Sequence, residues 1–196
     1  MTDIPGWPYG QKYEVVLADP PWHFQSWAPE KAGREVPYNT MSLDDIKALP
    51  VQDIAADDCV LFLWIVWPNL LDAIEVIKAW GFEYKTCAFA WIKADGSQVD
   101  MFHEEVKADM GLGYWTRANS EVCLLGTRGS PRRVDAGVRQ AIIEPRREHS
   151  RKPSCVYDRI ERLMGRDTRR IELFARTQRA NWHCWGNQTD KFRSTG

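Results

Sequence analysis

The sequence contains one short run of residues suited to holding an amine, Asp19-Pro20-Pro21-Trp22. The Asp19 carboxylate and the Pro20 carbonyl are both hydrogen-bond acceptors, so together they could accept both N–H bonds of a planar amino group. The two prolines restrict the backbone that carries these acceptors. Trp22 adds a flat aromatic surface on which a base extruded from a nucleic acid could stack.

This combination of acceptors suits chemistry at the exocyclic N6 amine of adenine. That nitrogen is a poor nucleophile because its lone pair is delocalised into the ring. Two acceptors that turn the lone pair toward an electrophilic methyl group would promote direct in-line transfer by positioning and electrostatics, without a covalent enzyme intermediate. Asp-Pro-Pro alone is also common as a turn. The apolar strand before it and the tryptophan after it favour the chemical interpretation.

The element that must position the tetrapeptide is the β-rich run 13–18, which the two prolines end. Further strands are expected at 59–67, 84–93, 121–126 and 170–174, and helices after Ser42, over 69–81 and behind Pro153. Such alternation predicts an α/β fold, a mostly parallel sheet with helices on both faces. Ligands bind beyond the carboxyl ends of such strands, where both Asp19 and Phe174-Ala175-Arg176 follow a strand.

Length and composition predict a single domain over residues 1–196, with 44% hydrophobic residues to form its core. The longest apolar stretch, 59–67, is too short to cross a bilayer, and the N-terminus lacks a secretion signal, so we expect a soluble cytoplasmic protein. The five cysteines are odd in number and contain no C-x-x-C pair. They are therefore expected to be reduced thiols, without a disulfide framework or a metal site.

The net charge of -1 conceals an uneven distribution. Residues 126–179 hold 15 lysines and arginines against 7 aspartates and glutamates, whereas acidic residues predominate before them. A local surplus of arginine can attract a polyanion even in a chain of ordinary isoelectric point. The candidates for a phosphate-facing surface are Arg128, Arg132, Arg133, Arg139, Arg146 and Arg147.

Several short motifs occur in a fixed order around this tetrapeptide. They are Ala18-Asp19-Pro20-Pro21-Trp22, Pro37-Tyr38-Asn39-Thr40-Met41, Leu61-Phe62-Leu63-Trp64, Trp91-Ile92-Lys93, Ser150-Arg151-Lys152-Pro153, Glu172-Leu173-Phe174-Ala175-Arg176, Asn181-Trp182 and Gly186-Asn187-Gln188. This ordered set resembles the MT-A70 family of adenine N6-methyltransferases. The family includes the catalytic subunit of the eukaryotic mRNA adenosine methyltransferase and many bacterial and phage DNA enzymes. The resemblance covers nearly the whole chain.

The resemblance implies a Rossmann-like class I methyltransferase that uses S-adenosylmethionine, permuted so that the catalytic motif precedes the cofactor motif. It implies that Lys152 and Arg176 approach the cofactor, that Phe174 sits under it, and that Asp19 contacts its methionine end. Its ribose would be bound by Asn187 and Gln188, and its adenine flanked by Asp3-Ile4. The connection after Arg176 is shorter than in the mRNA enzyme, which leaves contacts from Gln178 or Arg179 open.

On the substrate side, the resemblance assigns Tyr38 to a gate near the cofactor and the target base. Arg132, Arg133 and Arg146 are the arginines expected to accompany it there, facing the nucleic acid. A homodimer or a paired subunit is possible in this family.

Other functions remain to be weighed. Gly111-Leu112-Gly113 lacks the strand–helix setting of a dinucleotide fold, and the P-loop motif of nucleotide hydrolases is absent. A catalytically inert nucleic-acid-binding subunit is the serious alternative, although retention of Asp19, Trp22, Lys152 and Asn187 together favours an enzyme. DNA is favoured over RNA as the substrate, because a compact chain is typical of the family's bacterial and phage members.

Overall fold

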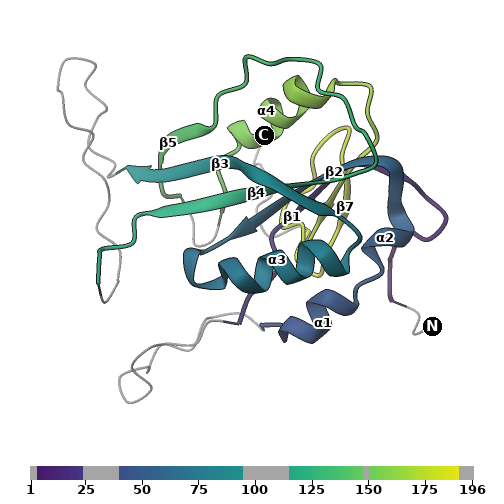
Figure 1. Cartoon of the computed structure of the whole chain (residues 1–196), viewed down its shortest axis with the longest axis horizontal. Helices are drawn as coiled ribbons and strands as arrows, with labels where there is room; N and C mark the ends of the chain where they lie inside the picture. The colour runs from purple at the N-terminus through teal and green to yellow at the C-terminus, as the bar shows by residue number, and fades with distance from the viewer. Residues whose placement is uncertain (1–3, 24–39, 95–114, 148–150, 190–196) are drawn as a thin grey trace.

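A computed structural model describes residues 4–23, 40–94, 115–147 and 151–189 of the chain (Figure 1). Its strands are β1 (Tyr13–Ala18), β2 (Ala55–Ile65), β3 (Glu83–Ala94), β4 (Ser120–Arg128), β5 (Ala141–Pro145), β6 (Arg170–Leu173) and β7 (His183–Trp185). Its helices are α1 (Leu43–Ala48), α2 (Val51–Ile54), the 3-10 turn η2 (Trp67–Asn69), α3 (Leu70–Ala79) and α4 (Cys155–Met164). Tyr38, Asp3 and Gly111-Leu112-Gly113, all named above, lie outside the described residues.

The seven strands form one sheet in the order β5-β3-β4-β2-β1-β6-β7. Every pairing is parallel except the two that β4 makes, with β2 and with β3. The expectation of a mostly parallel Rossmann-like sheet is therefore confirmed. Because β1 pairs with β6, the tetrapeptide after β1 and the loop after β6 leave the sheet at the same edge. We call this edge, where the parallel strands end, the carboxyl edge.

Helices cover both faces of the sheet, as predicted (Figure 1). On one face α1, α2 and α3 pack against alternate strand residues, among them Val16 and Leu61. On the other face α4 packs through Val156 and Ile160 against the residues between these, such as Leu17. The alternation follows from the two-residue period of a strand, and a central strand buried on both sides has no polar face. The core thus lies on both sides of β1 and β2.

Local signals explain the start of α1 and the end of α3. The Ser42 side chain accepts a hydrogen bond from the Asp45 N–H at 3.1 Å and so caps α1, as its position before two aspartates predicts. Gly81 adopts the left-handed conformation just past the end of α3. The sequence did not predict α2, β5 and β7, which are only four, five and three residues long. Their short apolar patterns carry no clear period.

The structure also bears on the predictions about cysteines and about membrane-spanning segments. All five cysteines are free thiols, as the sequence predicts. Within the described residues, no helix combines the length and apolar character needed to cross a membrane.

Trp22 is a core residue rather than an open aromatic surface. Only 9% of it is exposed, and it packs on the α1–α3 side of the sheet. Its indole N–H donates a hydrogen bond to the Trp64 carbonyl at 2.9 Å, and its backbone forms a parallel bridge with Met41. A base could stack on Trp22 only if this side chain left the core, so its placement differs from the stacking face expected above. In this structure Trp22 anchors the tetrapeptide to β2.

This anchor predicts a loss of stability on Trp22→Phe. Phenylalanine keeps a stacking ring but loses the N–H, which leaves the Trp64 carbonyl unsatisfied and should lower the free energy of unfolding by about 1–3 kcal/mol. Urea denaturation measures this change. Trp67→Phe is the control, because Trp67 is half exposed and should lose much less. Equal stability of the Trp22→Phe variant and the unaltered protein would contradict the anchoring role.

Candidate active site

The carboxyl edge collects polar side chains from distant parts of the chain. Asp19 follows β1, Phe174 follows β6 and Asn187 follows β7. Glu121 reaches the same edge because β4 is antiparallel and therefore begins where its neighbours end. The parallel strands thus bring the predicted residues Asp19, Phe174 and Asn187 to one edge. The antiparallel strand β4 adds Glu121, which was not predicted.

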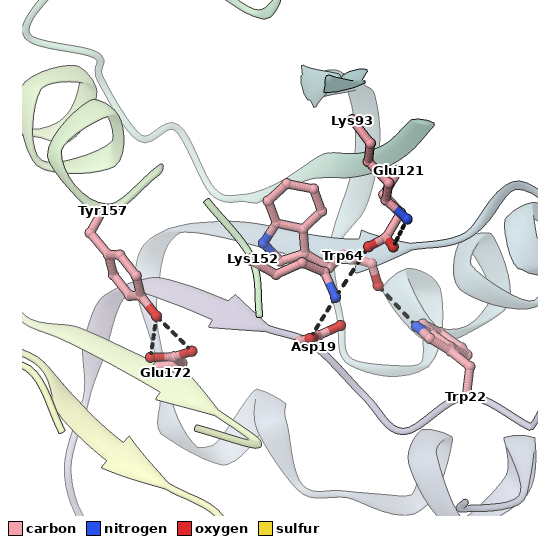
Figure 2. A network of polar contacts seen from close by, with 8 residues as sticks. All are labelled: Asp19, Trp22, Trp64, Lys93, Glu121, Lys152, Tyr157 and Glu172. Atoms are coloured by element: carbon pink, nitrogen blue, oxygen red, sulfur yellow. Dashed lines mark hydrogen bonds and ion pairs between the residues drawn. The ribbon is translucent and has the colours of Figure 1, made fainter. Parts of the chain in front are cut away.

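Lys152 is the centre of an ion network at this edge (Figure 2). Its ammonium lies 2.7 Å from an Asp19 oxygen and 3.3 Å from a Glu121 oxygen. The second Glu121 oxygen lies 2.6 Å from the ammonium of Lys93, the penultimate residue of β3. The side chains of Lys152, Asp19 and Glu121 are only 16%, 18% and 14% exposed, so these charges are largely shielded from solvent.

Burial acts to lower the pKa of Lys152, but the carboxylates of Asp19 and Glu121 outweigh it and raise this pKa above the ordinary lysine value. Burial likewise acts to raise the pKa of Glu121, and Lys152 and Lys93 overcome it, so the net shift is downward. Lys152 and Glu121 are therefore held in their charged forms by mutual attraction.

The ring of Trp64 supports the same ammonium. Lys152 Nζ lies 5.6 Å from the ring centroid, within the range of a cation–π contact. The backbone carbonyl of Trp64 is the acceptor for Trp22 (Figure 2). Trp64 therefore links the tetrapeptide to the lysine through its backbone on one side and its ring on the other.

The backbone of the tetrapeptide is also engaged. The Pro20 carbonyl accepts the Trp22 N–H at 2.8 Å, and the Pro21 carbonyl accepts the Met41 N–H at 3.0 Å. A carbonyl oxygen has two lone pairs, so Pro20 keeps capacity for one further hydrogen bond. These bonds hold the direction in which the Pro20 carbonyl points.

A second polar pair lies beside the network, between α4 and β6 (Figure 2). The Tyr157 hydroxyl lies 3.0 Å from each carboxylate oxygen of Glu172, to which it donates. Glu172 is 9% exposed. Burial raises the pKa of Glu172 to about 7, although the Tyr157 hydrogen bond acts to lower it. The nearby charge of Asp19 adds to the upward shift.

Tyr157 also helps to fasten the loop after β6 to α4. The Arg179 guanidinium lies over the Tyr157 ring, 4.6 Å from its centroid, and bonds Asp158 at 2.6 Å. Trp182 packs edge-on against the same ring and donates its indole N–H to Glu161 at 2.8 Å. The short connection after Arg176 is therefore fixed by side chains of α4.

Two cavities open at the carboxyl edge and share three lining residues, Asp19, Phe174 and Arg176. The smaller cavity, of about 310 Å³, lies on the α4 side and is also lined by Lys152 and Glu172. The larger cavity, of about 660 Å³, lies toward β7 and the N-terminal segment. Its lining includes Pro5, Gly6, Trp185, Asn187 and Gln188. Asp19 thus lies at the junction of the two.

The backbone at this junction is unusual. Phe174 is a non-glycine residue in the left-handed conformation, with φ of 62°. Such residues are uncommon outside functional sites. Gly186 approaches it so closely that a Cβ there would lie 2.8 Å from the Ala175 backbone nitrogen and oxygen. Only glycine allows β7 to end this close to the loop that carries Phe174.

The donor set of the two cavities fits S-adenosylmethionine. The Asn187 and Gln188 amides can bind ribose hydroxyls in the larger cavity, where Trp185 and Phe174 make an aromatic wall with ring centroids 5.6 Å apart. Lys152 and Arg176 can bind a carboxylate, and Asp19 lies between the two regions. The residues expected from the family resemblance to hold the cofactor are therefore brought together.

The predicted arginines, by contrast, are divided between two ends of the sheet. Arg146 and Arg147 follow β5 at the carboxyl edge, and Arg147 lines the smaller cavity. Arg132 and Arg133 lie at the other end because β4 carries the chain away from that edge before they occur. Their neighbours there are the start of β2, reached by Ser130, and the end of α4, reached by Val134.

Arg128 and Arg139 also lie away from Asp19. Arg128 ends β4 and donates to the Gln52 carbonyl, and Arg139 precedes β5. Arg132 and Arg133 thus do not share the site expected of them.

Sequence reasoning missed Glu121, Tyr157 and Glu172 as site residues and assigned no role to Lys93. Glu121 and Glu172 were visible as charges inside apolar strands, which is a signal of a paired group. Nothing in the sequence identified the partners, because each pair joins residues of different elements.

The raised pKa of Glu172 predicts how stability depends on pH. Protonation of Glu172 is favoured more in the folded state than in the unfolded one. Its contribution to the free energy of unfolding is therefore fully present below pH 4.5 and is lost as the pH rises through about 7. We expect Glu172→Gln to reduce this decline by roughly 3 kcal/mol, at about 1.4 kcal/mol per pKa unit. Urea denaturation from pH 4 to pH 8 measures it. Glu83→Gln, at an exposed position, is the control. If the free energy of unfolding depended on pH in the same way in the unaltered protein and in both variants, the predicted effect of Glu172 would be refuted.

Comparison with known proteins relates this chain to methyltransferases. A family model described as MT-A70 matches residues 13–188. The Type II methyltransferase M.MunI of Mycoplasma sp is 34% identical over 196 residues, which cover 90% of this chain and 77% of that protein. The N(6)-adenosine-methyltransferase MT-A70-like protein of Drosophila melanogaster is 34% identical over 93% of this chain. The N(6)-adenosine-methyltransferase catalytic subunit METTL3 of Homo sapiens is 32% identical over 91% of this chain.

The match covers different shares of these relatives. It spans most of M.MunI but only 28% of the Drosophila protein and of human METTL3. The matched family region contains every strand of the sheet, the tetrapeptide and the Lys152 network. This chain therefore belongs to the MT-A70 family.

Proposed function

We propose that this chain is an enzyme that transfers a methyl group from S-adenosylmethionine to the N6 amine of adenine in DNA. The observation that carries the proposal is the position of Asp19 at the junction of two cavities, one suited to an adenosine and both bordered by the residues expected to hold the cofactor. Relatives named N(6)-adenosine-methyltransferases support the choice of adenine N6.

In this mechanism Asp19 accepts one N6–H bond of the target adenine, and the remaining lone pair of the Pro20 carbonyl accepts the other. The bound S-adenosylmethionine supplies an electrophilic methyl group on its sulfonium. Lys152 holds the Asp19 carboxylate through their 2.7 Å contact, so that this acceptor does not have to reorganise when the amine arrives. Trp22 holds the backbone that carries both acceptors.

Asp19 also contacts the reacting nitrogen throughout the transfer, because its carboxylate accepts a hydrogen bond from the target amine while it is held by Lys152. As the nitrogen bonds to the methyl group and the methyl–sulfur bond breaks, the nitrogen becomes positively charged, so its N–H hydrogen bond to Asp19 strengthens in the transition state. The nitrogen then loses one proton, through Asp19 or directly to solvent, to give the neutral methylated amine.

The preference for DNA is supported by the similarity to the Type II methyltransferase M.MunI, which is 34% identical over 90% of this chain. RNA is the alternative substrate.

An inert nucleic-acid-binding subunit is the second candidate class. Against it stands the arrangement of Asp19, Lys152 and Glu121, because a protein that only binds nucleic acid gains nothing from burying three charges at the junction of two cavities.

The test is incubation of the purified protein with isotopically labelled S-adenosylmethionine and parallel pools of DNA and RNA, followed by nucleoside mass spectrometry. We expect labelled N6-methyldeoxyadenosine from the DNA pool. Asp19→Ala should lower the rate by about a hundredfold or more, since it removes an acceptor at the reacting amine. Circular dichroism checks that the variant is folded. Label in RNA alone would reject the DNA assignment, and label in neither pool would favour the inert subunit.

A second prediction concerns the cofactor. Asn187→Ala should raise the dissociation constant of S-adenosylmethionine roughly five- to tenfold, as expected for the loss of one hydrogen bond of about 1 kcal/mol or more. Isothermal titration calorimetry measures it. Gln52→Ala, which removes an exposed amide on α2, is the control and should bind normally. An unchanged dissociation constant for Asn187→Ala would reject the placement of the ribose in the larger cavity.

A further inference from the structure

A half-exposed aromatic side chain at the carboxyl edge has no role in the site described above. It is Trp67, the first residue of the 3-10 turn η2, which is 51% exposed. β2 runs parallel to β1 and lies between β1 and β4, so the turn after β2 begins at the carboxyl edge. Trp67 therefore leaves the sheet between the strand ends that carry Asp19 and Glu121.

Hydrogen bonds join this turn to the chain on both sides of it. The Trp67 indole N–H donates to the Ser120 hydroxyl at 3.1 Å, and Ser120 directly precedes Glu121. The Asn69 side-chain amide donates to the carbonyl of His23, the residue after the tetrapeptide, at 3.3 Å. The turn is therefore fastened to the start of β4 and to the chain that leaves the tetrapeptide, and the Trp67 ring is oriented relative to both.

The bond to Ser120 leaves the two faces of the Trp67 ring unused. An indole N–H lies in the plane of its ring, so this hydrogen bond is made by the edge of the side chain. Among the residues that the structure describes, no other aromatic ring and no cation stacks on Trp67. Part of an apolar ring thus faces solvent in a fixed orientation, and such preorganisation favours binding of a flat ligand.

A nucleic acid that presents an adenine amine to Asp19 exposes such a ligand. Extrusion of the target base uncovers a face of the base next to it, and an aromatic side chain that covers this face lowers the free-energy cost of extrusion. Trp22 cannot cover it, because it is packed in the core. The Asp19 side chain is only 18% exposed, and the two cavities that meet there do not include Trp67 in their lining. The base that reaches Trp67 is therefore the neighbour of the target and not the target itself.

We propose that Trp67 stacks on the nucleobase next to the target adenine in the bound nucleic acid. The inference rests on the proposed function, which places the amine of the target at Asp19. Every nucleobase has a flat aromatic face, so this contact holds the strand without reading its sequence.

Contact with another protein chain is the alternative use of an exposed tryptophan. A stable protein interface buries about 800 Å² on each partner, far more than one half-exposed indole supplies. The bonds that place Trp67 beside the ion network and the tetrapeptide favour the nucleic acid.

The experiment compares Trp67→Phe with Trp67→Leu. Both variants lose the hydrogen bond to Ser120, but only phenylalanine keeps an aromatic face. Tyr84→Leu is the control, because it removes a 40% exposed ring near the start of β3, at the opposite end of the sheet. Fluorescence anisotropy measures binding of two labelled strands, an oligodeoxyadenylate and a strand of equal length in which one adenine is flanked only by abasic sugars. Circular dichroism checks that each variant is folded.

We expect Trp67→Leu to bind the oligodeoxyadenylate roughly tenfold more weakly than the unaltered protein, and Trp67→Phe only about two- to threefold more weakly. The two variants should bind the single-adenine strand equally, because it offers no neighbouring base. The slope of log affinity against log salt should be the same in all the proteins, since no charge is changed. Tyr84→Leu should bind both strands normally.

Equal affinity of Trp67→Phe and Trp67→Leu for the oligodeoxyadenylate would overturn the stacking role. A difference that persisted on the single-adenine strand would place Trp67 on the target adenine and overturn the assignment to its neighbour. A changed oligomeric state in sedimentation velocity, with nucleic-acid binding intact, would assign Trp67 to a protein interface and overturn it too.

Oligoriboadenylate is measured in parallel, so that a wrong polymer is not mistaken for a wrong residue. A difference between Trp67→Phe and Trp67→Leu with RNA alone would support stacking on Trp67 while rejecting the DNA assignment. Because anisotropy does not depend on turnover, these results are separate from failure to methylate adenine.

Discussion

The arrangement of side chains at the carboxyl edge depends on one buried ammonium group, that of Lys152. Lys152 lies between the carboxylates of Asp19 and Glu121, and each of the three comes from a different element. Burying these charges is unfavourable by itself, and the arrangement is tolerated because every charge has an opposite partner at short range. Removing Lys152 would leave two acids facing each other. The end of β1, the start of β4 and the loop before α4 are therefore tied together by a single side chain.

The direction of β4 makes this network possible. Every pairing in the sheet that does not involve β4 is parallel, and a β4 in the parallel direction would have placed Glu121 at the opposite edge. The same reversal sends Arg132 and Arg133 away from Asp19. The reversed direction of β4 thus adds an acid to the carboxyl edge and places Arg132 and Arg133 at the opposite end of the sheet. The next strand, β5, runs back and brings Arg146 and Arg147 to the carboxyl edge.

The junction of the two cavities is shaped by backbone constraints as well as by charge. Phe174 adopts a left-handed conformation directly after β6, and Gly186 allows β7 to end against the same loop. On the α4 side, Arg179 and Trp182 hold the continuation of that loop against Tyr157. Strain of this kind persists only where surrounding contacts determine the conformation, which these contacts from α4 and β7 do.

The sequence by itself determined the alternation of strands and helices and the order of the motifs. It also predicted that Asp19 and Phe174-Ala175-Arg176 leave their strands at the same edge, because parallel strands share their carboxyl ends. Local patterns are sufficient for such conclusions, since hydrophobic periodicity, prolines and capping residues act over a few positions.

Only the tertiary structure decided which side chains meet. The burial of Trp22 depends on its distant hydrogen bond to Trp64, and the partners of Lys152 depend on the direction of β4. Short elements such as β5 and β7 exist because neighbouring strands complete their hydrogen bonds, which their own residues do not encode. Contacts between residues far apart in sequence leave no periodic trace, so pairing, burial and strand direction remained for the folded chain to establish.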